Sequence, residues 1–238
     1  MVDVAIVDYG MGNLRSVEQA VRHVAPDAQV VVTDEAKVIA NASRVVFPGQ
    51  GAMPDCMREL DSRNLRGAVL EAARNKPFLG ICIGLQMLFE HSEEGDVAGL
   101  GLLRGRVARF AHDLHDAQGN RLKVPHMGWN QVQRINQAAS PQGGATVAIT
   151  PSVGGKLDRG CEAPHALWNG IAQDARFYFV HSYYVQPDDV SLVQATSDYP
   201  QPFVCAVAQE NLFAVQFHPE KSHAAGLQLL RNFTQWNP

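Results

Sequence analysis

A cysteine between two glycines, directly after a short apolar segment, constrains this chain more than any other feature. Pro-Phe-Leu at 77–79 leads into Gly-Ile-Cys-Ile-Gly at 80–84, and a helix-like stretch follows over residues 85–90. A strand, a tight turn bracketed by glycines and a helix form a nucleophile elbow, in which a strained turn presents the reactive side chain. We therefore expect Cys82 at the end of a buried strand, where the free N–H groups of the following helix favour its thiolate.

A histidine and a glutamate near the end of the chain complete this pattern. His218-Pro219-Glu220 follows the apolar segment 213–217. Imidazole can act as a base toward a thiol, and a carboxylate two residues later can orient the ring. A cysteine in an apolar segment is more often a small buried hydrophobic residue. The two elements together favour catalysis, and we predict a triad of Cys82, His218 and Glu220.

The order of apolar segments indicates the fold class. Strand-like and helix-like segments alternate through the first half, which predicts a three-layer α/β fold with a mostly parallel, doubly wound sheet and helices on both faces. The predicted strands cover 2–7, 30–32, 45–47 and 78–81, and the predicted helices cover 14–24 and 65–74. The second half predicts added antiparallel strands at 107–110, 131–135, 177–180, 192–195, 204–208 and 213–217, then a helix over 224–233. We expect one domain spanning residues 1–238.

Composition excludes several classes of protein. The chain has 238 residues, is 46% hydrophobic and carries a net charge of -4, with its basic residues scattered. This argues against binding to nucleic acid or to an anionic membrane, and no apolar run approaches the ~20 residues of a membrane span. The four cysteines form no Cys-x-x-Cys pair, which is typical of a reducing compartment. With no basic segment before the first strand, we expect a cytoplasmic protein. Separately, we expect no cofactor and no metal.

Three further segments have more than one interpretation. Residues 138–164 are rich in Ala, Gly, Pro and Ser, so we expect an exposed, mobile insertion, with a short hairpin over 145–150 as the alternative. Histidines and aspartates at 112–116 could bind a metal, but a solvated loop is favoured because no further ligand cluster supports them. Gly10-Met11-Gly12 stands where a dinucleotide loop would, yet Arg15 replaces the third glycine of that motif.

Several separated motifs together resemble a known family. Gly80 to Gln86 and His218-Pro219-Glu220 are similar to class I glutamine amidotransferases. Within this family, the chain resembles the glutaminase subunits of imidazole glycerol phosphate synthase through its segments at 7–14, 48–51, 125–130 and 178–183. The resemblance runs from the first strand to the last helix, and residues 138–164 look like an insertion relative to it. It implies that the chain hydrolyses glutamine and delivers ammonia to a β/α-barrel cyclase subunit, as a heterodimer in histidine biosynthesis.

The resemblance also implies further site residues. The oxyanion hole is expected from the backbone at Ile83 and at Gln50 and Gly51, and glycines on both sides of Gln50 allow that peptide to rotate. The family commonly has an apolar residue in place of Gln50. The implied glutamine pocket comprises Gly51, Gln86, Glu94, Ser182 and Tyr183. The implied partner interface includes Asn13 and Trp129.

Some of these residues also have plainer interpretations. Gln86 could face solvent, Glu94 lies in a charged run, and Trp129 could be a core residue of a strand. His181 is expected to be structural or part of the partner interface, rather than the base. Two other functions remain open at this point. One is a class I amidotransferase with a different partner, such as one serving pyridoxal phosphate synthesis. The other is a catalytically silent regulator, against which the intact triad argues.

Overall fold

The computed structural model describes residues 2–135 and 165–238, so the insertion predicted at 138–164 lies outside the described residues. The first half contains β1 (Val4–Val7), α1 (Leu14–Val24), β2 (Val30–Thr33), α2 (Ala36–Asn41), β3 (Arg44–Gly49), α3 (Met53–Ser62), α4 (Arg66–Asn75), β4 (Phe78–Cys82) and α5 (Ile83–Gln86). The strands β5 (Phe89–Ser92), β6 (Val97–Ala98), β7 (Leu103–Arg109), β8 (His126–Gln131) and β9 (Gln133–Arg134) follow. The described part after residue 164 contains β10 (Arg176–His181), β11 (Tyr183–Pro187), β12 (Val193–Asp198), β13 (Pro202–Gln209), β14 (Leu212–Val215) and α6 (His223–Gln235). Short 3-10 turns lie at Ala166–Trp168, Val190–Leu192 and Pro219–Lys221.

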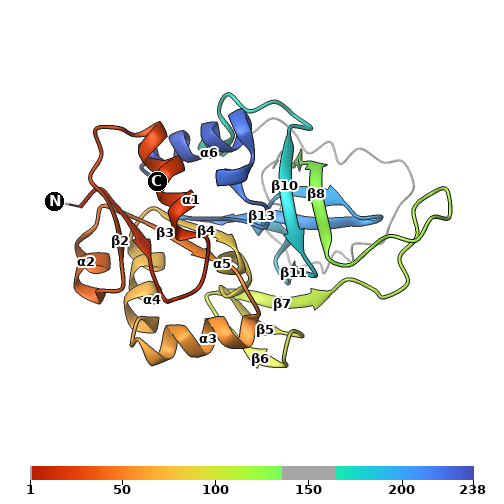
Figure 1. Cartoon of the computed structure of the whole chain (residues 1–238), viewed down its shortest axis with the longest axis horizontal. Coiled ribbons are helices and arrows are strands. Elements are labelled where there is room, and N and C mark those ends of the chain that lie inside the picture. The colour runs from red at the N-terminus through yellow and green to blue at the C-terminus, as the bar shows by residue number, and fades with distance from the viewer. Residues whose placement is uncertain (1, 136–164) are drawn as a thin grey trace.

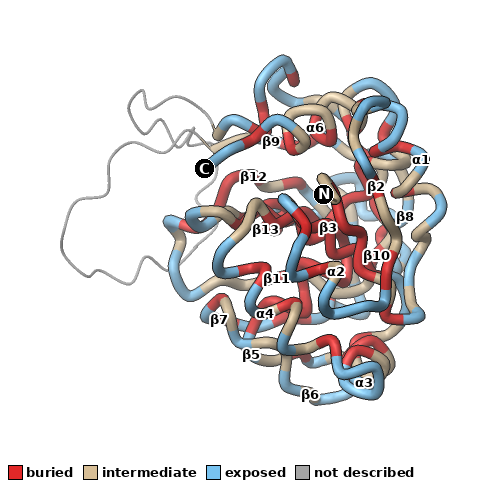
Figure 2. Tube along the Cα trace, turned by 90° about the vertical axis from the view of Figure 1, so that its left-hand side faces the viewer, coloured by how far each residue is buried: buried red, intermediate tan, exposed pale blue. Residues whose placement is uncertain are grey.

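A parallel core forms the centre of the main sheet. Its strands run in the order β2-β1-β3-β4-β14, and each neighbouring pair is parallel. Helices α1 and α6 pack on one another on one face, while α2 and α4 pack together on the other (Figure 1). All residues of β1, β4 and β14 are buried, as expected for strands covered on both faces. Figure 2 shows the same burial along the inner strands, with exposed positions on outer helices such as α2 and α3.

Antiparallel strands extend this core. β13 pairs with β14, then β11 and β7 continue the sheet, and β12 with β9 adds to β13. Strands β8 and β10 form a separate two-stranded ribbon (Figure 1). The predicted three-layer α/β class, with a mostly parallel core and antiparallel strands in the second half, is confirmed.

The helix predicted over residues 85–90 is wrong. α5 ends at Gln86, and Phe89 already begins β5, which pairs in parallel with β7. Residues 83–89 are all buried, so the segment has no exposed face such as an amphipathic helix shows. Burial on every side allows the chain to turn and enter the sheet.

Other element predictions were incomplete. The helices α2 and α3 were missed, as were β5, β6 and β11. The strand predicted over 131–135 is two strands, β8 and β9, interrupted at Val132. β8 begins five residues earlier than predicted, because its polar residues pair with β10 over the register His126↔His181 to Gln131↔Arg176.

Three strand ends meet at one edge of the parallel core. Gly49 at the end of β3 lies opposite Cys82 at the end of β4, and Val215 at the end of β14 lies opposite Ile81. Ligand sites of open α/β sheets form at this carboxyl edge. The topology therefore brings the segments after Gly49, Cys82 and Val215 together.

Candidate active site

Cys82 occupies a strained elbow. Its φ is 56° and its ψ is -110°, a conformation that a non-glycine residue rarely adopts. The glycines on both sides are required by space. A Cβ at Gly84 would collide with the Phe47 carbonyl oxygen, and one at Gly80 would lie 3.0 Å from the Ala214 Cβ. The elbow thus fits only because β3 and β14 can pass close to it.

His218 and Glu220 form a buried pair. His218 Nδ1 lies 2.9 Å from Glu220 Oε1, and both side chains are buried. Burial lowers the pKa of His218, but the neighbouring Cys82 and Glu220 raise it to about 10. The surroundings of the ring therefore favour the imidazolium form of His218 at neutral pH, beside the Cys82 sulfur. This is the charge arrangement that an activated cysteine needs.

The backbone of His218 is fixed by the ribbon strand β10. His218 N donates to the Tyr178 carbonyl over 2.9 Å. Ser222 Oγ donates to the His218 carbonyl over 2.6 Å and accepts from Tyr178 N over 3.0 Å. The base is thus anchored to the ribbon, and Ser222, which the sequence did not single out, is a link between them.

The predicted oxyanion segment follows β3 beside the elbow. Gly51 has a φ of 121°, which favours glycine, and the Gln50 carbonyl accepts from Cys56 Sγ over 3.8 Å. The loop of Gly10-Met11-Gly12 packs against this segment: Cβ positions built at Gly12 and Gly51 would lie 3.6 Å from the Gly49 Cα and 2.6 Å from the Met11 Cε. The loop therefore contacts the segment where a backbone donor is predicted.

Two predicted pocket residues are hydrogen-bonded to each other. Gln86 is buried, so the alternative of a solvent-facing side chain is wrong, and its Nε2 donates to the Tyr183 carbonyl over 3.1 Å. The preceding residue, Ser182, accepts from Phe110 N over 3.0 Å through its carbonyl. His181 is buried and donates from Nδ1 to the Tyr183 carbonyl over 2.8 Å. His181 is thereby bonded to the first residue of β11.

The Glu94 side chain contacts the N-terminus of α3. Its Oε2 accepts from Met53 N, the first residue of that helix, over 2.8 Å. Burial raises the pKa of this carboxyl group. A carboxylate at a helix N-terminus is stabilised by the free N–H groups there, so Glu94 has a structural role in addition to any part in binding an ammonium group.

The two predicted interface residues are both accessible. Asn13 is partly exposed at the N-terminus of α1 and makes no capping hydrogen bond through its side chain. Trp129 is 37% exposed, and its ring stacks on His223 with centroids 4.9 Å apart. Met127, on the same strand, is 62% exposed. The alternative of a core tryptophan is wrong, because side chains on β8 point alternately inward and outward.

Gln216 is a site residue that the sequence analysis missed. It is fully buried, and its Nε2 lies 3.8 Å from Cys82 Sγ. A polar residue between Val215 and Phe217 was the available signal. An amide in an all-buried strand needs hydrogen-bond partners there.

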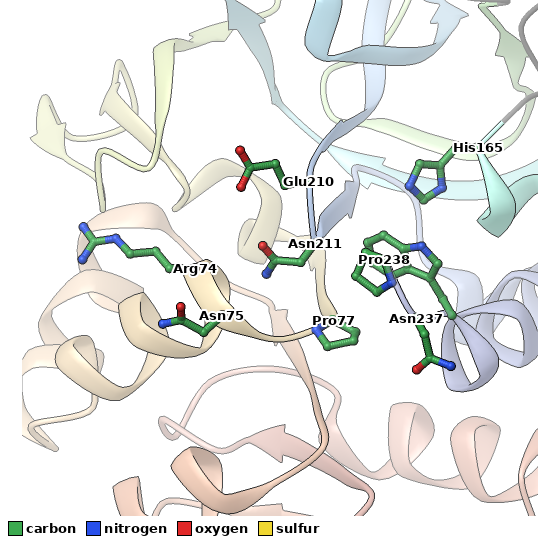
Figure 3. A pocket seen from close by; sticks show the side chains of 9 residues that line it. Arg74, Asn75, Pro77, His165, Glu210, Asn211, Asn237 and Pro238 are labelled. Atoms are coloured by element: carbon green, nitrogen blue, oxygen red, sulfur yellow. The ribbon is translucent and has the colours of Figure 1, made fainter.

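The reactive sulfur is almost closed off from solvent. Cys82 is 5% exposed. A pocket of about 760 Å³ lies elsewhere, between α4, the β13–β14 turn and the C-terminus (Figure 3). Its lining includes Pro77 and Asn211, which precede β4 and β14, so it lies at the opposite edge of the sheet. We therefore place the candidate site by its chemistry at the carboxyl edge. The described residues hold no group of three or more metal-ligating side chains.

Comparisons with known proteins identify the family of this chain. The family model for glutamine amidotransferase class-I matches residues 5–236, and the chain belongs to that family. It is 60% identical over 238 residues to imidazole glycerol phosphate synthase subunit HisH of Thiobacillus denitrificans, covering 100% of this chain and 92% of the relative. It is 59% identical to the protein of the same name from Nitrosospira multiformis, with 100% of both chains covered.

A solved structure supports the fold independently. The crystal structure of a glutamine amidotransferase matches with a TM-score of 0.64 at 14% identity, covering 97% of this chain and 97% of that one. The resemblance expected from the sequence is confirmed for both family and fold.

Proposed function

We propose that this chain is the glutaminase subunit of an imidazole glycerol phosphate synthase. It hydrolyses glutamine to glutamate and ammonia, and a cyclase subunit uses the ammonia to form imidazole glycerol phosphate and AICAR in histidine biosynthesis. The observation that carries the proposal is the buried His218–Glu220 pair beside Cys82, in a chain similar over its full length to HisH proteins. We propose that glutamine hydrolysis takes place in the cytoplasm, in one domain and without a cofactor. The described residues include no helix long and apolar enough to cross a membrane.

The proposed reaction is an acyl transfer. The Cys82 thiolate attacks the side-chain amide carbon of glutamine, and the oxyanion of the tetrahedral intermediate is stabilised by backbone N–H groups at Ile83 and at the Gln50–Gly51 segment. His218 gives a proton to the leaving nitrogen, so that ammonia departs and a thioester remains. Water, deprotonated by His218, cleaves the thioester to glutamate, which releases the Cys82 thiolate beside the reprotonated His218. Glu220 orients the ring throughout.

Substrate glutamine is proposed to bind beside the elbow. In this proposal Gly51, Gln86, Ser182 and Tyr183 line the pocket. Gln86 Nε2 donates to the Tyr183 carbonyl, and Gln86 Oε1 is buried without a hydrogen-bond partner. A buried acceptor of this kind suits the ammonium group of the substrate. Glu94 contributes negative charge nearby, beyond its bond to Met53.

Ammonia has to leave through a protected route, because in bulk water at neutral pH it is mostly protonated and then not nucleophilic. A β/α-barrel cyclase subunit, bound as a heterodimer, provides this protection. We propose that it binds the face carrying Asn13, Met127 and Trp129. An exposed aromatic residue beside an exposed methionine is a typical centre of a protein interface.

The decisive experiment is a glutaminase assay with and without the purified cyclase subunit. Stimulation by that subunit supports the proposal. Activity that only a different synthase stimulates identifies another amidotransferase, and no activity in either assay identifies a silent regulator.

A Cys82→Ala variant tests the division of labour. Glutamine-dependent synthesis is expected to disappear in the assembled complex, while synthesis from added ammonium persists, because Cys82 only generates ammonia. Loss of both activities in a correctly assembled complex would contradict this assignment.

A further inference from the structure

A line of hydrogen bonds leads away from the nucleophile through groups that the proposed triad does not use. Gln216 Nε2 donates to Cys82 Sγ over 3.8 Å, and Gln216 Oε1 accepts from Gln86 Nε2 over 3.0 Å. Gln86 Nε2 also donates to the Tyr183 carbonyl over 3.1 Å. The exposed fractions of Gln216 and Gln86 are 0% and 2%, so bulk water does not compete for these partners.

The partners determine which way each amide faces. A backbone carbonyl only accepts, so Gln86 must turn its nitrogen toward Tyr183. The same nitrogen reaches Gln216, which must then present its oxygen. Gln216 is left with an N–H group facing Cys82 Sγ. In the reverse orientation a carbonyl oxygen would face the sulfur and disfavour its thiolate.

Two histidines, His181 and His126, form further hydrogen bonds that are consistent with this orientation. His181 Nδ1 donates to the same Tyr183 carbonyl over 2.8 Å, so His181 Nε2 accepts from His126 Nδ1 over 3.0 Å. His126 Nε2 accepts from Asn130 Nδ2 over 3.3 Å. Every contact is satisfied by two neutral rings with one defined tautomer each. Burial lowers the pKa of His126 to about 4 and that of His181 to about 3, which agrees with neutral rings.

We propose that Gln216 is a further catalytic residue, whose N–H donates to the Cys82 thiolate, and that Gln86, the Tyr183 carbonyl and the His181–His126 pair are positioning groups that hold this donor toward the sulfur. The inference rests on the proposed glutaminase function and deepens it. A neutral N–H donor lowers the free energy of the thiolate without competing with His218 for a proton.

Other titratable groups around the sulfur do not replace this donor. Tyr9, Cys56 and His218 each interact electrostatically with Cys82. Burial raises the pKa of Tyr9 and raises that of Cys56 to about 11, so both are neutral near pH 7. His218 therefore supplies the charged stabilisation and Gln216 the neutral one.

The test measures the reactivity of Cys82 in the isolated full chain. Alkylation by iodoacetamide is followed against pH, and the modified Cys82 peptide is quantified by mass spectrometry. In Gln216→Met the pH at which alkylation reaches half its maximal rate is expected to rise by ~1 unit, because the thiolate loses one charge-assisted hydrogen bond. In Gln216→Glu, which is almost isosteric, the rise is expected to be larger because a carboxylate faces the thiolate. Glutaminase kcat should fall ~10-fold or more in both variants, with KM changing less.

Controls separate this role from packing. Gln194 is also a buried glutamine, on β12, and Gln194→Met should leave the alkylation profile unchanged. Thermal unfolding shows whether each variant is folded. His181→Asn preserves a donor near the Nδ1 position, whereas His181→Gln places its amide near the Nε2 position. His181→Asn should therefore shift the profile less than His181→Gln. An unchanged profile in folded Gln216→Met and Gln216→Glu overturns the inference, as does an equal shift in Gln194→Met.

Alkylation requires neither glutamine nor a partner. A parent chain that the cyclase subunit fails to stimulate would overturn the proposed function, while a shifted profile in the Gln216 variants would still support the donor role. The two failures are therefore distinguishable.

Discussion

The His218 ring lies between two groups that stabilise its charged form, and the consequences can be tested residue by residue. Glu220→Gln retains an amide that can still orient the imidazole through Nδ1, whereas His218→Ala removes the proton carrier itself. We expect Glu220→Gln to lower glutaminase kcat by ~10–100-fold and His218→Ala by ~1,000-fold or more. Steady-state kinetics with the cyclase subunit present measures both, and equal losses would contradict the separate roles.

The buried histidines make stability depend on pH in the acid range. For His126 and His181 the folded-state pKa lies below the unfolded value of 6.5. Between those values the unfolded chain binds more protons, so stability falls as the pH drops from about 6.5 toward 4, by up to ~1.4 kcal/mol per pH unit for each ring. Above pH 6.5 these rings contribute no slope.

Urea unfolding at several pH values measures this dependence. The control is His126→Gln, which cannot take up the proton and should flatten the slope by about one proton equivalent. Identical slopes for parent and variant between pH 6.5 and 4 would show that His126 is not held neutral.

At the scale of elements, the ribbon of β8 and β10 connects the outer face to the base. Tyr178 of β10 anchors His218 and lies opposite Trp129 of β8 in the ribbon register. Met127→Ala with Trp129→Ala should weaken binding of the cyclase subunit by ~2–4 kcal/mol, because buried aromatic residues dominate such interfaces. Calorimetric titration measures the loss. Lys37→Ala on α2, an exposed residue on a different element, is the control and should bind normally. Normal binding by the double variant would show that the cyclase subunit does not bind at Met127 and Trp129.

The turn after β3 is the other element that we expect to matter. Gly51 has a φ of 121° and contacts Met11 of the neighbouring loop. Gly51→Val should hinder rotation of the adjacent peptide and lower partner-stimulated kcat by ~100-fold, the effect of losing an oxyanion donor. Gly101→Val also places a β-branched residue at a positive φ, 65°, but at a position with open space around it, and should retain stimulation. Equal stimulation in both variants would exclude this turn as the site of control.

At the scale of the whole molecule, the closed site predicts weak activity for the isolated chain. Cys82 is 5% exposed, and the proposed oxyanion donor depends on rotation of the peptide beside Gly51. Binding of the cyclase partner and its ligand should raise kcat much more than it changes KM, because an oxyanion donor acts in the transition state. Glutaminase kinetics of the chain alone, with the partner, and with the partner and its ligand test this expectation. Full activity of the isolated chain would contradict it.

The sequence by itself determined the class and the chemistry of this protein. Alternating apolar segments of buried-strand length predict a parallel core, because such strands need helices on both faces. Glycines around Cys82 and a proline after His218 restrict the local backbone, so strand, elbow and base could be placed from short segments alone. The motifs at residues 7–14, 48–51, 125–130 and 178–183 were sufficient to indicate the family that the comparisons then showed.

Only the tertiary structure decided which polar groups meet in the interior. Residues 85–90 look helical, yet residues 83–89 are all buried, and the chain leaves the helix after Gln86 and enters the sheet at Phe89 as β5. Gln216, Gln86 and His181 lie far apart in the chain. Their hydrogen bonds form because the end of β14, α5 and the junction of β10 with β11 come together beside Cys82. Local sequence patterns record periodicity and turn chemistry. The partner of a buried amide depends instead on which strands become neighbours, and that is a property of the folded sheet.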